Sequence, residues 1–150
     1  MNRDHFYITL FSNACQHIYP DSKIAAFTIK LAQPIILDLS EIWEVGLCEI
    51  SSPSTLPVRD NMIALVYCDP IAPQFIGTNM VRFLRAFNTT WPADYDTEYL
   101  YDNVYYVPVE KRMFRDIPIE ILNLTGERVA FKDSKTPLKV VLHFRRVIIH

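Results

Sequence analysis

The chain has 150 residues, of which 50% are hydrophobic, 13% aromatic and 21% charged. This composition excludes a disordered tail, because disordered segments are poor in aromatic and β-branched residues. Fifteen Lys and Arg stand against seventeen Asp and Glu, a formal net charge of −2 without any block of like charges, which argues against non-specific binding to a polyanion. A chain of this length can bury about 70% of its unfolded surface, so residues 1–150 are predicted to form one domain.

Hydrophobic residues in the first half of the chain recur with a period of two, which is typical of β-strands. Pro34 is expected to end the second of these strands, and Ser51–Asp60 is predicted to be a surface loop because it holds two prolines and several polar residues. The segments predicted to be strands are Phe6–Phe11, Lys23–Leu31, Trp43–Ile50 and Met62–Cys68.

The second half continues the same pattern with longer interruptions. Thr89–Asp102 is predicted to be a long aromatic loop, and Glu110–Arg115 a charged connection with room for a short helix. The turn signal at residues 123–126 predicts a hairpin between Ile117–Leu122 and Arg128–Lys132. The other predicted strands are Val81–Phe87, Val104–Val109 and Leu138–Arg145.

These segments add up to eight or nine strands, separated by turn signals and without a long segment of helical period. Such spacing predicts an all-β fold, an antiparallel β-sandwich or barrel. The chain has 10 prolines and only 3 glycines, so irregular loops are expected in place of tight hairpins. Long crossings from sheet to sheet favour a single jelly roll over an up-and-down meander.

No pattern in the sequence points to catalysis, to a cofactor or to a metal. The four histidines share no ligand spacing, and His143 is expected to face outward on the last strand. The three glycines are isolated, so a phosphate-binding loop is excluded. Neither a signal peptide nor a membrane-spanning run is recognisable, and a non-secreted protein with reduced thiols is therefore expected. Those thiols belong to Cys15, Cys48 and Cys68.

The aromatic segment before residue 102 is the most distinctive candidate for binding. Its rings are interleaved with acidic residues, whereas stacking on nucleic acid would need basic ones. Exposed Tyr and Trp on a rigid sandwich are typical of protein interfaces. The alternative is that the rings fold back over one end of the sandwich as a cap. The rings are Trp91, Tyr95, Tyr99 and Tyr101.

Four stretches, taken together, resemble a known family of virion proteins. The sequence is similar to the minor capsid, or penton, proteins encoded by Polinton (Maverick) elements and by adintovirus-like relatives. The resemblance covers nearly the whole chain, although its motifs are strand patterns and not catalytic signatures. The stretches that carry it are Phe6–Asn13, Phe27–Leu31 with Pro34-Ile35, Trp43–Ile50 and Val140–Arg146.

The resemblance implies a jelly-roll subunit of an icosahedral virion that is located in the cell during assembly and in the capsid afterwards. The expected partners are other copies of the chain, in a pentamer at the vertices, and a double jelly-roll major capsid protein. Assembly would cover exposed side chains that include Phe11 and Tyr19 as well as the aromatic segment. Related proteins are longer, so an N-terminal domain of a longer chain is the alternative to a single-domain protein.

A second function stays open at the level of sequence. A non-enzymatic β-sandwich of this kind could instead be an attachment module that recognises a receptor or a glycan through the loop from Trp91 to Tyr101, or a host-captured copy of the viral protein. A discrete homo-oligomer would favour the capsid hypothesis. A monomer with a ligand-sized pocket beside Trp91 would favour the attachment module.

Overall fold

The computed structural model describes residues 4–55, 63–89, 96–132 and 136–148. These residues form strands joined by turns and irregular loops, and no helix that could span a membrane occurs among them. The strands are β1 (His5–Phe11), β2 (Ala26–Ile36), β3 (Trp43–Ser52), β4 (Ile63–Cys68), β5 (Gln74–Ile76), β6 (Asn79–Val81), β7 (Phe83–Asn88), β8 (Thr97–Leu100), β9 (Tyr106–Pro108), β10 (Met113–Leu122) and β11 (Lys139–Arg146).

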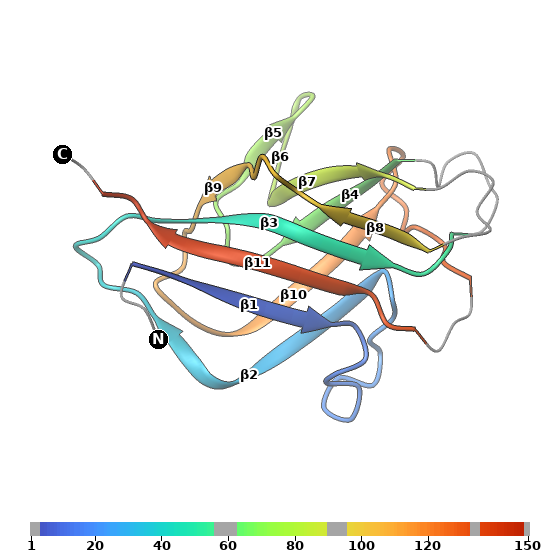
Figure 1. Cartoon of the computed structure of the whole chain (residues 1–150), viewed down its shortest axis with the longest axis horizontal. Coiled ribbons are helices and arrows are strands. Elements are labelled where there is room, and N and C mark those ends of the chain that lie inside the picture. Colours follow the sequence, from blue (N-terminus) through green and yellow to red (C-terminus); the bar gives the residue numbers. More distant parts are fainter. Residues whose placement is uncertain (1–3, 56–62, 90–95, 133–135, 149–150) are drawn as a thin grey trace.

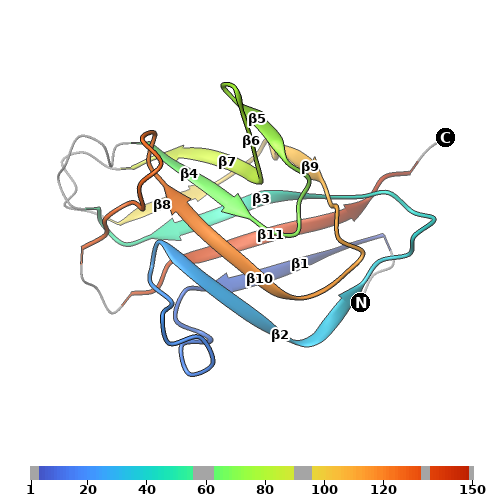
Figure 2. The same ribbon diagram turned by 180° about the vertical axis from the view of Figure 1, so that it is seen from behind.

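Two antiparallel sheets face each other and form a sandwich. The five-stranded sheet has the order β1-β11-β3, and β8 and β9 then pair with successive parts of β3. The four-stranded sheet has the order β2-β10-β4-β7. Figure 1 shows the first sheet in front, and Figure 2 shows the second from the opposite side. Strands β5 and β6 form a separate hairpin that projects from the sandwich (Figure 1).

The chain passes from one sheet to the other at nearly every step. Strands β1, β3, β8, β9 and β11 belong to the five-stranded sheet, whereas β2, β4, β7 and β10 belong to the other. Because β8 and β9 share one position beside β3, the sandwich has eight strand positions. This alternation between two sheets is the connectivity of a jelly roll. The predicted antiparallel β-sandwich of eight to nine strands is thus confirmed.

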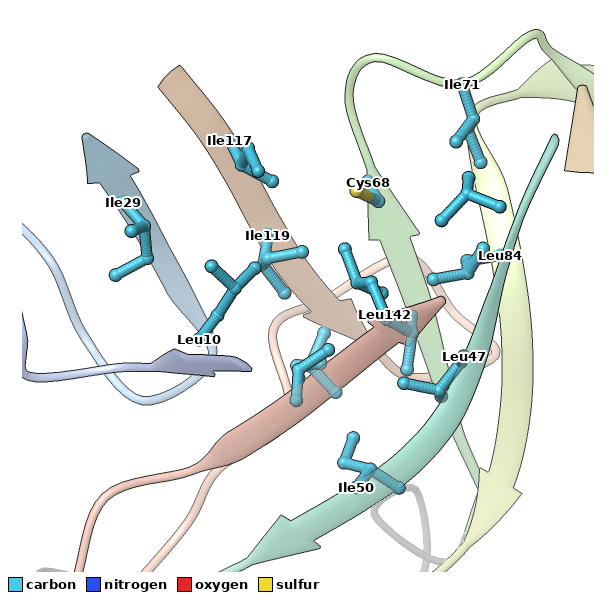
Figure 3. Packing of buried hydrophobic residues seen from close by; sticks show 14 of the residues in the cluster. Leu10, Ile29, Leu47, Ile50, Cys68, Ile71, Leu84, Ile117, Ile119 and Leu142 are labelled. Atoms are coloured by element: carbon cyan, nitrogen blue, oxygen red, sulfur yellow. The ribbon is translucent and has the colours of Figure 1, made fainter. Parts of the chain in front are cut away.

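The core lies between the sheets and is built mainly from alternate residues of the strands. On β11 the side chains of Val140, Leu142 and Phe144 are buried, while the intervening residues face outward. Strand β10 of the other sheet presents Ile117, Ile119 and Ile121 in the same way, and Figure 3 shows aliphatic side chains of the two sheets meeting in the middle. A period of two therefore places one face of each strand in the core.

Pro34 does not end the second strand, contrary to the sequence prediction. Strand β2 begins only at Ala26 and continues through Pro34 to Ile36. It is an edge strand, where a missing N–H is tolerated. Its ladder with β10 is also irregular here: Lys30 pairs with Asp116 and Ile35 with Phe114, so the residues between them lie at a register shift.

Three predictions for the second half need correction. The connection before β10 forms no helix, because residues from Met113 onward already belong to that strand. Part of the segment predicted to be an aromatic loop is strand β8. The turn at residues 123–126 is present, and the side-chain oxygen of Asn123 accepts bonds from the backbone of Thr125 and Glu127. However, Leu122 and Arg128 form only one bridge, and the chain then leaves the sheet so that Phe131 can bridge Thr55.

The predicted strand Val81–Phe87 is divided between two structures, and the hairpin that precedes it was missed. Val81 ends β6, whereas β7 starts at Phe83. Gly77 lies in the two-residue turn between β5 and β6 with a φ of 60°, a left-handed conformation that favours glycine. The hairpin places Phe75 directly opposite Met80, and both side chains are exposed.

Replacing Gly46 with alanine is expected to destabilise the sandwich by about 1–3 kcal/mol, the usual range for overpacking. Gly46 lies in the middle of β3, where an added Cβ would come within 2.3 Å of Cγ1 of Val104 and 2.9 Å of the carbonyl oxygen of Tyr105. The second of these atoms is backbone, so the segment leading into β9 would have to move. Urea denaturation measures the effect, and an unchanged midpoint would show that this close approach does not exist.

Candidate assembly surface

The outer face of the five-stranded sheet is organised in rows, each of which crosses β1, β11, β3 and either β8 or β9. The pairing registers of β1, β11, β3, β8 and β9 place four residues side by side in each row. Outward-facing side chains on neighbouring strands in register lie close enough to interact. The four rows are His5–Arg145–Glu44–Pro108, Tyr7–His143–Gly46–Tyr106, Thr9–Val141–Glu49–Leu100 and Phe11–Lys139–Ser51–Glu98.

Charged groups on this face pair with one another. In the first row, Nε of Arg145 lies 2.5 Å from Oε1 of its neighbour Glu44. Between the last two rows, Nζ of Lys139 lies 2.6 Å from Oε1 of Glu49. The hydrogen bond to Glu49 raises the pKa of Lys139, which therefore stays charged. Large side chains elsewhere on the face are left exposed, among them Tyr7, Phe11 and Leu100. A face with internally paired charges and exposed apolar groups is suited to contact with another protein.

A histidine and tyrosine network occupies the second row. Gly46 has no side chain, so the ring of Tyr106 can reach across β3 to β11, where its hydroxyl lies 2.7 Å from Nδ1 of His143. Nε2 of His143 lies 3.0 Å from Nδ1 of His5, and the ring of Tyr7 stacks on His143 at 4.3 Å between centroids. His143 does face outward, as the sequence predicted, and both of its ring nitrogens are engaged.

The stability of the protein is expected to fall as the pH decreases below about 6.5, partly because of His143. Burial, followed by the nearby His5 and Arg145, lowers the pKa of this imidazole. A histidine whose pKa is lower in the folded state binds fewer protons there than in the unfolded chain, where the pKa is about 6.5. The stability that results from this lowered pKa is therefore fully present above pH 6.5, and it is lost as the pH falls through the pKa of His143 in the folded protein.

Urea denaturation of the wild type and of His143→Gln at pH 7.5 and pH 5 isolates this contribution. The wild type is expected to lose more stability on acidification than the variant, because the variant has no imidazole that takes up a proton when the protein unfolds. Equal losses in the two proteins would contradict the assignment.

Two of the contact residues predicted from the sequence lie on different sides of the sandwich. Phe11 is exposed at the end of β1, on the outer face of the five-stranded sheet. Tyr19 is half-buried, and its hydroxyl donates a hydrogen bond of 2.7 Å to Asp116 on the other sheet. It lines a groove of about 550 Å³ that crosses β2, β4 and β10.

The remaining predicted contacts are the aromatic residues near β8. Tyr99 and Tyr101 stack on each other at 5.7 Å and pack against the core, and the Tyr99 hydroxyl donates to the carbonyl of Asn88. The guanidinium carbon of Arg85 lies 3.5 Å from the centre of the Tyr101 ring. These contacts are those of a cap over the sandwich, one of the two alternatives for these rings. Trp91 and Tyr95 lie outside the described residues.

Sequence reasoning missed two other exposed apolar groups. Phe75 of the β5–β6 hairpin is 71% exposed and lines a groove of about 500 Å³ against β7 and β9. At the end of the sandwich that carries the β2–β3 connection, Ile36 and its cross-strand neighbour Met113 are exposed, as is Leu39. The isolated Gly77 could have indicated a turn at the hairpin, whereas the contact between Ile36 and Met113 depends on a strand register that the sequence does not reveal.

The described residues offer little reactive chemistry. Within them, no three His, Cys, Asp or Glu side chains lie together as a metal site would require. Cys15, Cys48 and Cys68 are free thiols. Burial raises the pKa of Cys68 to about 12, so this thiol stays protonated and is a poor nucleophile.

Comparison with known proteins gives an informative similarity among the solved structures. No protein-family model matches the sequence, and no curated protein matches it either. Among solved structures, the crystal structure of the mavirus penton protein aligns with 96% of this chain and 99% of its own, with a TM-score of 0.65 and 8% sequence identity. The chain has the fold of a penton protein. The resemblance to penton proteins of Maverick-type elements is thereby confirmed for the fold, over nearly the full length of both chains.

Proposed function

We propose that the chain is a structural subunit of a viral capsid, a minor capsid protein that assembles with itself at the vertices of an icosahedral shell. The observation that carries this proposal is the alignment of nearly the whole chain with a penton protein, without a large unmatched insertion on either side. The jelly-roll connectivity and an outer sheet face with exposed apolar residues and paired charges support it further. In this proposal residues 1–150 are one assembling domain with a structural and not a catalytic role.

Five copies around a vertex would form a closed ring. A ring requires two different surfaces on each copy, because each subunit contacts its neighbours in a head-to-tail manner. The outer margin of such a ring would meet the major capsid protein, for which a double jelly-roll protein is proposed. The expected location of the protein is then the virion.

Co-expression with a double jelly-roll major capsid protein, followed by electron microscopy, tests this role. Closed shells are expected when both proteins are present, with density for this chain at the five-fold positions. Shells with empty vertices are expected when it is omitted. Shells in which the chain is absent from the five-fold positions would contradict the proposal, whereas binding of the purified chain to a glycan or a receptor would support an attachment module instead.

A further inference from the structure

Strand β1 is an edge strand without the features that usually protect such an edge. Proteins block edge strands with charged residues, prolines or bulges, because an open edge can pair with another chain. The two edge strands of the four-stranded sheet contain such residues, Lys30 and Pro34 in β2 and Arg85 in β7. By contrast, β1 contains no Lys, Arg, Asp, Glu or Pro, and its ladder with β11 has no register shift.

The hydrogen bonds at the two ends of β1 show which of its backbone groups are open. The N–H of Arg146 donates to the carbonyl of Asp4, and the N–H of Ser12 donates to that of Leu138. Residues along an antiparallel strand alternate between bonding the partner and pointing away. Even-numbered residues therefore bond β11, and the N–H and carbonyl groups of the odd-numbered residues point to the open side. Those residues are His5, Tyr7, Thr9 and Phe11, of which Phe11 already uses its carbonyl to accept a hydrogen bond from the N–H of Ala14.

The same reasoning applies to β8 at the opposite margin of the sheet. The N–H of Tyr101 donates to the carbonyl of Cys48 on β3. Thr97 and Tyr99, which precede Tyr101 by four and two residues, share its orientation toward β3. Glu98 and Leu100 consequently direct their backbone groups away from the sheet, and the side chain of Leu100 is 70% exposed.

We infer that β1 of one copy pairs with β8 of the next copy in an antiparallel ladder; this inference rests on the proposed function, for which it names the contact between subunits. Each of the three steps in the order β1-β11-β3-β8 is antiparallel, so β1 and β8 run in opposite directions. If a rotation about an axis parallel to the strands relates two copies, the strand directions are the same in both, so β1 of one copy is antiparallel to β8 of the other. The five-stranded sheets of successive copies can then continue into one another, and Figure 1 shows β1 and β8 at opposite margins of that sheet.

Residues of β1 and β8 occupy the same cross-strand rows of the sheet, so the two edges are in register with each other. Thr9 lies in the same cross-strand row as Leu100, and Phe11 in the same row as Glu98. A neighbour placed without stagger therefore brings Thr9 beside Leu100, while the exposed ring of Phe11 reaches the same apolar group diagonally. Main-chain hydrogen bonds would supply the pairing, and this apolar contact would be buried with it.

Proline substitutions at the open positions test the contact without removing a hydrogen bond within the sandwich. Thr9→Pro deletes an outward N–H of β1, and Glu98→Pro deletes an outward N–H of β8. Both positions lie on edge strands, where proline is tolerated. Thr9→Ala and Glu98→Ala are the matched controls. Thermal unfolding monitored by circular dichroism shows whether each variant retains the fold.

Light scattering then separates the outcomes. Each proline variant alone is expected to be a monomer, and each alanine control an oligomer. An equimolar mixture of the two proline variants is expected to give a complex of twice the 17.5 kDa chain mass, since one intact β1 edge can still meet one intact β8 edge. Folded proline variants that oligomerise like the wild type would overturn this contact but leave the proposed function in place. A wild type that remains monomeric would overturn the proposed function itself.

Discussion

Replacing Phe144 with alanine is expected to lower the free energy of unfolding by about 3–5 kcal/mol, the range observed for deletion of a buried aromatic ring. Phe144 is fully buried on β11, the strand between β1 and β3. Its ring stacks on Phe6 at 5.0 Å and on Phe114 of the facing sheet at 5.9 Å. The substitution therefore removes an aromatic contact between the two sheets, and a loss of this size is a large part of the total stability of a typical domain.

Urea denaturation measures this effect, and Val141→Ala provides the control on the same strand. Val141 faces outward and is only partly buried, so its truncation is expected to cost about 1 kcal/mol or less. If Phe144→Ala were as mild as Val141→Ala, the ring would not lie between the sheets. The two variants together thus test the inward and outward assignment of β11.

Replacing Leu100 with arginine is expected to abolish assembly while leaving the fold intact. Leu100 is 70% exposed, so a longer charged side chain can extend into solvent in the isolated chain. At the subunit contact the same side chain would have to fit against Thr9 and Phe11 of the neighbouring copy, and its charge would lose water there. A cost of 2 kcal/mol or more, typical of central interface positions, would weaken each contact by about 30-fold or more.

Leu124→Arg is the matched control for this substitution. Leu124 is 67% exposed, almost as much as Leu100, but it lies in the turn after β10, which belongs to the other sheet. Sedimentation velocity is expected to show monomers for Leu100→Arg and wild-type assemblies for Leu124→Arg. The same sedimentation behaviour in both variants would contradict a contact at β8.

The sandwich was predictable where one face of a strand is buried and the other exposed. Strand β11 follows strict alternation, and β3 alternates on either side of Cys48, where its register with β11 shifts by one residue, so most of their inward faces could be recognised from the order of residues alone. Pro34 misled the prediction because its effect depends on whether a strand lies at an edge, which is a property of the assembled sheet. The β5–β6 hairpin was missed because its three-residue strands are too short to establish a period.

The candidate surface was less predictable than the fold. His5 and His143 are 138 residues apart and meet only through the register of β1 with β11. The direction of the Tyr99 and Tyr101 rings depends on where β8 joins β3, and the sequence reveals only that aromatic residues are frequent there. Phe11 was predicted to be an exposed side chain that assembly would cover, and it is exposed at the end of β1.

The mass of the purified chain in solution tests the central claim most directly. Light scattering over a range of protein and salt concentrations is predicted to give a discrete species near five times 17.5 kDa, because a head-to-tail contact between successive copies closes into a ring. A mass of 17.5 kDa at every concentration would contradict self-assembly of this chain.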